Sequence, residues 1–126
     1  SLKKTWEKYI VVGAGKTGID AVLYLLKQGV APSKIQWIVS NDAWMFNRDI
    51  IMPKKVLITI KRQLQTVLNA QSPKDIFLGF EKEGMFLRLN QNIWPVKFRC
   101  ATISLEELEQ VLRVEDIAAS SFLQIG

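Results

Sequence analysis

Residues 8–20 read Lys8-Tyr9-Ile10-Val11-Val12-Gly13-Ala14-Gly15-Lys16-Thr17-Gly18-Ile19-Asp20. A short apolar run leads into a Gly-x-Gly-x-x-Gly motif, and a helical pattern follows directly. This order predicts a strand, a tight turn and a helix, which together bind the pyrophosphate of a dinucleotide. Gly13 would allow the turn, Gly15 would let a pyrophosphate approach the backbone, and Gly18 would let the helix pack closely on the strand.

A helix is expected over residues 16–28. Its apolar residues recur at helical spacing, at Ile19, Val22, Leu23, Leu26 and Val30. Gly29 and Pro32 then end it. The free backbone amides and partial positive charge at its start suit a phosphate. A second strand over 35–39 would complete a parallel, right-handed β-α-β unit.

The glycine motif supplies the first candidate cofactor-binding residues, Gly13, Ala14, Gly15, Lys16, Thr17 and Gly18. Gly15-Lys16-Thr17 is also similar to the end of a Walker A loop, but that loop needs a glycine where Ile10 stands. An ATP-hydrolysing loop is therefore excluded. Two interpretations remain: a dinucleotide site, which we favour, and a glycine-rich turn without a ligand.

The end of the second strand supplies three further candidates, Ser40, Asn41 and Asp42. NAD sites usually place an acidic residue there to bind the ribose hydroxyls. Ser40 and Asn41 are uncharged and would not repel a 2′-phosphate, whereas Asp42 could bind a ribose or cap a turn. The nearest arginine is Arg48, so NAD and NADP both remain open. Trp44 is expected to pack in the interior rather than stack on an adenine.

Composition limits the other functions. The chain has 126 residues, 48% of them hydrophobic, which suits one domain. It has no histidine, and no cluster of residues with metal-site spacing. Cys100 is the single cysteine, so we expect a buried structural thiol in a reducing cytoplasm. The net charge of +5 is attributed to basic residues on solvated faces rather than to a nucleic-acid-binding surface. No apolar run is long enough to cross a membrane.

Further elements follow in order. A helix is expected from Pro53 to about residue 68, although 56–60 would also suit a strand. The other expected elements are a helix from Ser72 to Gly84, strands over 85–89 and 98–103, a helix with a Ser104/Glu107 capping box, and an extended segment over 117–125. The predicted class is α/β: a Rossmann-like parallel sheet flanked by helices, with a helical insertion after the second strand.

Residues 9–21 resemble the pyridine-nucleotide-binding segment of flavin-containing monooxygenase-like oxidoreductases, as found in a bacterial branch of that family. Residues 35–38 with 42–44 resemble the next family segment, and 98–104 with 107–108 resemble a later one. The resemblance implies that residues 1–126 are one NAD(P)H-binding domain of a larger flavoprotein. Family members tend to carry arginines where Val39 and Asn41 stand, so the choice of NADP or NAD stays open.

The implied role is to hold the nicotinamide for hydride transfer to FAD, with FAD bound by a flavin-binding domain of the parent chain. No residue of this chain is then catalytic, and the isolated chain is not expected to turn over. A homodimer is a further expected association, and neither nucleic acid nor membrane is an expected partner. The alternative is a ligand-free Rossmann-like module for interaction or regulation, which the uncharged Ser40-Asn41 pair favours.

Overall fold

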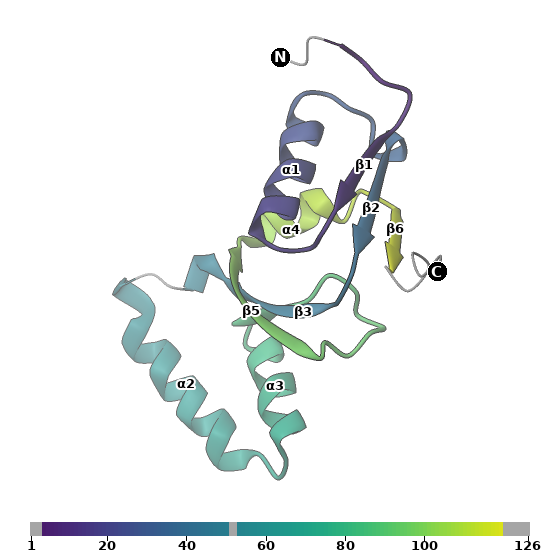
Figure 1. Cartoon of the computed structure of the whole chain (residues 1–126). Helices are drawn as coiled ribbons and strands as arrows, with labels where there is room; N and C mark the ends of the chain where they lie inside the picture. The colour runs from purple at the N-terminus through teal and green to yellow at the C-terminus, as the bar shows by residue number, and fades with distance from the viewer. Residues whose placement is uncertain (1–3, 51–52, 120–126) are drawn as a thin grey trace.

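The computed structural model (Figure 1) describes residues 4–50 and 53–119. These residues form a mixed α/β structure with four α-helices and two three-stranded sheets. The mixed α/β class agrees with the prediction from sequence. No helix within the described ranges is both long and apolar enough to span a bilayer.

The first sheet is parallel throughout. It contains, in spatial order, β1 (Tyr9–Val12), β2 (Ile35–Val39) and β6 (Asp116–Ala119). Val12 lies opposite Ile38, so the predicted parallel pairing of the first two strands is confirmed. β2 is the central strand and its Trp37 is fully buried. The predicted segment 117–125 falls within the described residues only as far as residue 119.

Two helices, α1 (Lys16–Lys27) and α4 (Leu105–Val111), lie side by side against this sheet (Figure 1). Their apolar sides and the sheet form the main core, which includes Ile19, Val22, Ile35, Trp37, Val111 and Val114. Gly29, with a φ of 86°, follows the end of α1, and the Ser104/Glu107 capping box starts α4, both as predicted. On β1, the alternate side chains Ile10 and Val12 point away from this core and are exposed.

The second sheet is mixed. It contains β4 (Phe86–Leu87), β3 (Ala43–Asn47) and β5 (Lys97–Ile103), with β3 antiparallel to β4 and parallel to β5. β3 was not expected from the sequence, and it separates the two middle helices from β2. The helical insertion therefore follows the third strand rather than the second. Cys100 lies in β5, but its side chain is outside the described part, so its expected burial stays a prediction.

An aromatic cluster covers this second sheet. The ring of Trp44 stacks on Phe77 at a centroid distance of 5.7 Å and meets the edge of Trp94 at 5.4 Å. Phe86 contacts Trp44, Phe77 and Phe98 within 6 Å. Trp44 is 2% exposed, so its expected packing role is confirmed.

The two middle helices are α2 (Val56–Asn69) and α3 (Pro73–Lys82), which form a hairpin beside the second sheet (Figure 1). Residues 56–60 are thus helical rather than extended. Ser72 caps α3 by accepting a hydrogen bond from the Asp75 amide, and Gly84, with a φ of 74°, follows it. Short 3-10 turns occur at Pro32–Lys34, Arg48–Ile50 and Pro53–Lys55.

Candidate functional site

The glycine turn joins β1 to α1 in a conformation that explains two of its three glycines. Gly13 has a φ of 102°, a backbone angle that residues other than glycine rarely adopt. A Cβ atom on Gly18 would overlap the carbonyl oxygen of Gly13, so the first turn of α1 packs directly on the strand end. Gly15 has an ordinary φ of −76°. Its conformation does not require glycine, which leaves the close approach of a ligand as its expected role.

Trp37 anchors this turn from the neighbouring strand. Its indole Nε1 donates a hydrogen bond to the carbonyl oxygen of Gly13 at 2.7 Å. The amide of Gly13 in turn donates to the carbonyl oxygen of Ile38 at 2.8 Å. Both backbone groups of Gly13 are therefore bound by β2, which fixes the turn before any ligand arrives. Sequence analysis missed this role, since it depends on the register that sets Trp37 beside the end of β1.

The start of α1 offers backbone donors to an anion. Gly15 occupies the N-cap position and supplies no side chain to cap the first amides, and the first turn contains no acidic residue. The helix macrodipole adds partial positive charge at this end. Lys16 is the first residue of α1, and its Nζ pairs with Asp20 Oδ1 at 2.7 Å. Its charge is shared with that carboxylate, so the main attraction for a phosphate comes from the backbone.

The second group of candidates, Ser40, Asn41 and Asp42, follows the end of β2. Because β1 and β2 are adjacent and parallel, residues 13–18 and 40–42 leave the sheet at the same edge. All nine predicted residues therefore follow strand ends at the same edge of this sheet. Asn41 and Asp42 are half-buried there, and burial raises the pKa of the Asp42 carboxyl above its ordinary value.

Charged residues of α4 and of the turn after β3 adjoin this edge. Arg48 donates to Oε2 of Glu107, and the carboxylate of Asp49 accepts a hydrogen bond from the Leu105 amide at 3.0 Å. Burial alone would raise the pKa of Glu107, but the Ser104 amide, Arg48 and Lys16 together lower it below its ordinary value. Arg48, the nearest arginine in sequence, is thus engaged by Glu107.

This edge of the sheet offers both hydrogen-bond donors and a hydrogen-bond acceptor. Its donors are backbone amides at a helix start, and its acceptor is the half-buried Asp42 beside the end of β2. Such a site can hold a diphosphate and a ribose. The charges of Lys16 and Arg48 are paired with Asp20 and Glu107, so neither side chain is a free cation for a 2′-phosphate.

The chain is similar to uncharacterised mycobacterial proteins. It is 38% identical over 125 residues to proteins of Mycobacterium tuberculosis and of Mycobacterium bovis. No family model matches the chain, and no solved structure matches it. The match covers 95% of this chain but 23% of each relative. The chain therefore spans about a quarter of the length of these relatives, and most of each relative has no counterpart in it.

Proposed function

We propose that this chain is a Rossmann-like, NAD(P)H-binding domain of a larger flavin-dependent oxidoreductase of the monooxygenase-like kind. Its role is to hold the nicotinamide so that a hydride passes to FAD, which a flavin-binding domain of the same polypeptide binds. The cofactors supply the redox chemistry. Residues 13–18 and 40–42 orient the dinucleotide, and no side chain among them acts as a catalytic acid or base.

The single observation that carries the proposal is the contact between Gly18 and Gly13. It holds the uncapped start of α1 against the end of β1, so the first amides of the helix are directed toward the turn. Asp42 follows the end of β2 at the same edge, and the proposal assigns it to the ribose. The length of the mycobacterial relatives supports a domain within a longer polypeptide.

The energies predict weak binding by the isolated chain. A phosphate at a helix N-terminus gains about 0.3–1 kcal/mol, and up to about 2 kcal/mol when it is partly buried. A dissociation constant of about 1 μM requires roughly 8 kcal/mol. Contacts with the ribose, the adenine and the flavin-binding domain have to supply the remainder.

The test is a titration of the ¹⁵N-labelled chain with NADPH and with NADH, followed through its amide shifts. We expect shifts centred on residues 13–18, with smaller ones at 40–42, at millimolar ligand. Shifts confined to other elements, or none at all, would contradict the proposal. Adenosine serves as the control, because it lacks the diphosphate and should leave the amides of 13–18 unmoved.

A second candidate function is a Rossmann-like module that binds no ligand and serves interaction or regulation. One observation favours it: the nearest arginine, Arg48, is engaged by Glu107, and Ser40 and Asn41 carry no charge. The same titration separates the two functions, because this module predicts no shift at the glycine turn with either dinucleotide.

A further inference from the structure

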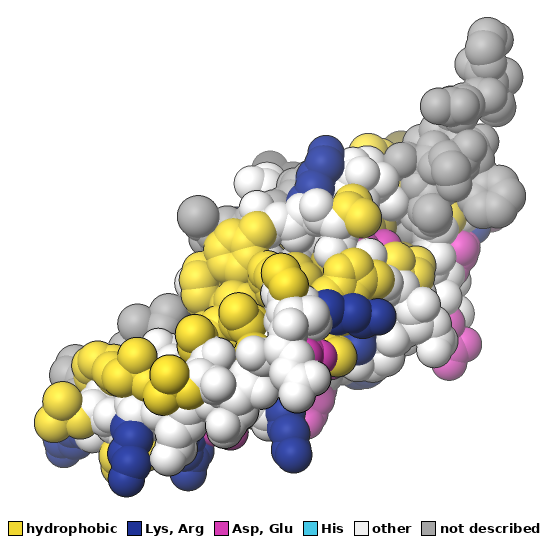
Figure 2. All heavy atoms as spheres, turned by 90° about the horizontal axis from the view of Figure 1, so that it is seen from below, with side chains coloured by type: hydrophobic (Ala, Val, Ile, Leu, Met, Phe, Trp, Pro, Cys, Tyr) yellow, Lys and Arg dark blue, Asp and Glu magenta, His cyan; other side chains and the backbone are white. Residues whose placement is uncertain are grey.

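Helix α2 exposes a continuous apolar surface. The surface consists of Leu57, Ile60, Leu64, Val67 and Leu68, which recur at helical spacing and which we call the α2 stripe. Their exposed fractions range from 45% for Ile60 to 83% for Leu57. None of the 14 residues of α2 is buried. Seen from below in Figure 2, hydrophobic side chains run along the end of the molecule that α2 forms, with Lys and Arg side chains beside them.

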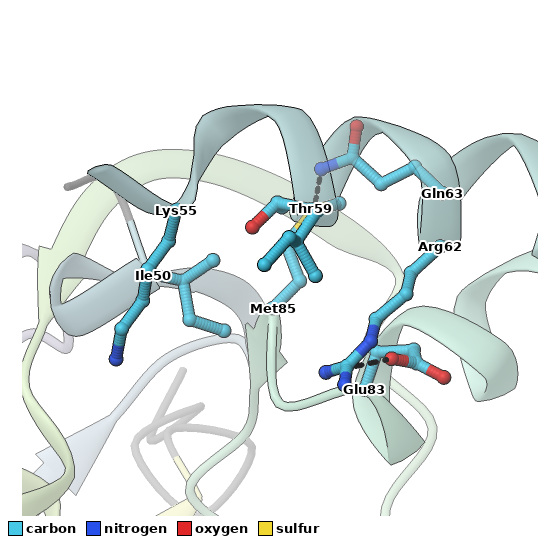
Figure 3. A pocket seen from close by; sticks show the side chains of 8 residues that line it. Ile50, Lys55, Thr59, Arg62, Gln63, Glu83 and Met85 are labelled. Carbon is cyan, nitrogen blue, oxygen red and sulfur yellow. Dashed lines mark hydrogen bonds and ion pairs between the residues drawn. The ribbon is translucent and has the colours of Figure 1, made fainter. Parts of the chain in front are cut away.

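The body of the protein contacts a different side of α2, which is largely polar. Gln63 Nε2 donates to Met85 Sδ at 2.7 Å, and Arg62 pairs with Glu83 at 3.7 Å (Figure 3). A Cβ on Gly79 of α3 would overlap Cγ2 of Thr66. An amphipathic helix normally buries its apolar side. Here the polar side faces the protein, and the apolar stripe is left available to a partner.

The stripe continues into an apolar hollow. This hollow, of about 250 Å³, lies between α2 and the second sheet and is lined mainly by Phe46, Ile50, Val56, Ile60 and Met85. Ile60 belongs both to the stripe and to the hollow. A partner on the stripe would therefore also meet an apolar recess beside the helix.

The charge around the stripe selects the chemistry of the partner. Residues 54–74 contain five basic residues and no acidic one; the basic residues are Lys54, Lys55, Lys61, Arg62 and Lys74. Arg62 is paired with Glu83 on the side of α2 that faces the protein, and Lys74 lies over the ring of Trp94, so the charge beside the stripe comes from Lys54, Lys55 and Lys61. A second copy of α2 would bring no carboxylate to pair with them and would add like charge. An apolar groove with acidic residues at its rim would match both the stripe and its charge.

We propose that the α2 stripe docks on the remainder of the longer polypeptide, in an apolar groove with an acidic rim. This inference rests on the proposed function to the extent that the chain is one domain of a longer protein. More than three quarters of each mycobacterial relative lies outside the matched region, and the corresponding part of the longer polypeptide is the partner that we propose. Contact along the stripe would remove five apolar side chains from water.

The test compares the 126-residue chain with the full polypeptide whose reading frame encodes it. Leu64→Glu alters the stripe, and Ile58→Glu is its matched control, because both residues are 59% exposed and lie roughly 120° apart around α2. Within the 126-residue chain, neither variant should change the melting temperature by more than about 4 °C. In the full polypeptide, amide hydrogen exchange of α2 should be at least about tenfold slower than in the 126-residue chain. Leu64→Glu should remove that protection and Ile58→Glu should keep it.

Four results would overturn the inference. The first is equal exchange of α2 in the full and the 126-residue chains, and the second is equal effects of the two variants. The third is a dimer of the 126-residue chain that Leu64→Glu converts to a monomer, which assigns the stripe to a second copy. The fourth is Leu64-dependent sedimentation of the full polypeptide with phosphatidylcholine–phosphatidylglycerol vesicles, which assigns it to a membrane surface.

The NADPH titration separates this inference from the proposed function. Leu64→Glu should leave the shifts of residues 13–18 intact, because the stripe and the glycine turn lie on different elements. Absence of those shifts together with Leu64-dependent protection of α2 would overturn the cofactor assignment and leave the docking standing. NADPH-induced shifts of residues 13–18 without protection of α2 in the full polypeptide would overturn the docking and leave the cofactor assignment standing.

Discussion

A Cβ atom on Gly18 would overlap the carbonyl oxygen of Gly13, the same oxygen that accepts the indole hydrogen bond of Trp37. The strand end, the start of α1 and the central strand therefore meet at one carbonyl group. Any side chain at position 18 must push α1 away from β1 or break the hydrogen bond. Backbone conformation and packing thus require Gly13 and Gly18, whereas Gly15, with its ordinary φ, is required by neither.

Gly18→Ala should lower the free energy of unfolding by about 2–4 kcal/mol, because the overlap is with backbone and cannot be relieved by a side-chain rotation. Gly15→Ala is the comparison, since its φ of −76° suits alanine, and it should cost about 1 kcal/mol or less. Urea unfolding measures both. Equal losses for the two variants would show that Gly18 has no special contact.

Gly15→Ala is expected to act on the ligand instead. A methyl group at this position stands where the pyrophosphate would approach the backbone, so the NADPH-induced shifts of residues 13–18 should be largely lost. The far-ultraviolet circular dichroism spectrum should stay unchanged, which separates lost binding from lost folding. NADPH shifts equal to those of the unaltered chain would contradict the assigned role of Gly15.

Trp37→Phe should destabilise the protein by about 1–3 kcal/mol. The variant keeps an aromatic ring in the core but leaves the Gly13 carbonyl without its indole donor and creates a small void. The measurement is again the free energy of unfolding in urea. Trp44→Phe provides a contrast, because the buried indole of Trp44 belongs to the other sheet. This substitution should leave the amide shift of Gly13 unchanged. A loss below about 0.5 kcal/mol for Trp37→Phe would show that the hydrogen bond contributes little.

Local chemistry made some elements predictable from sequence. Gly13 and Gly29 mark positive φ, and the Ser104/Glu107 capping box fixes a helix start within four residues. The parallel pairing of β1 and β2 follows from the crossover that α1 makes. These features need no knowledge of distant contacts, which is why periodicity and turn residues identify them.

Other features depend on contacts that sequence spacing does not show. β3 is nearly continuously buried because β4, β5 and the Trp44 cluster enclose it, so it lacks the alternation of a half-exposed strand. Arg48 and Glu107 meet across 59 residues of chain. The apolar side of α2 predicts a buried helix face, but tertiary contacts use the polar side around Gln63 instead.

The stability of the protein should fall in acid through Glu107. Its folded-state pKa is lowered, so its contribution is present above the ordinary pKa of 4.5 and is lost as the pH falls through the lowered value. The carboxylate is partly exposed, which limits the contribution to about 1 kcal/mol or less. Glu107→Gln should therefore reduce stability more at pH 7 than in acid, and the loss measured by urea unfolding should shrink as the pH falls below 4.5. An equal loss at pH 7 and in acid would show that charge is not involved.

Asp42 has the opposite linkage, because burial raises its folded-state pKa. Protonation of Asp42 favours the folded state at low pH, and that contribution is lost as the pH rises through the raised value, so Asp42→Asn should be neutral or stabilising at pH 7. Asp42 also follows the end of β2, at the edge where the proposed dinucleotide would lie. Removing its charge should strengthen NADPH binding by about fivefold, since a 2′-phosphate near Asp42 costs roughly 1 kcal/mol in water. NADH has a 2′-hydroxyl in place of the phosphate, so it should bind Asp42→Asn no more tightly than it binds the unaltered chain.

Asp116→Asn is the matched control for this change. It removes the same charge at the start of β6, and in a parallel sheet the strand starts lie at the edge opposite the glycine turn. Dissociation constants from the amide titration should therefore change for Asp42→Asn and not for Asp116→Asn. If the two variants shift the NADPH-to-NADH preference alike, the effect is one of net charge, and Asp42 does not lie beside the ribose.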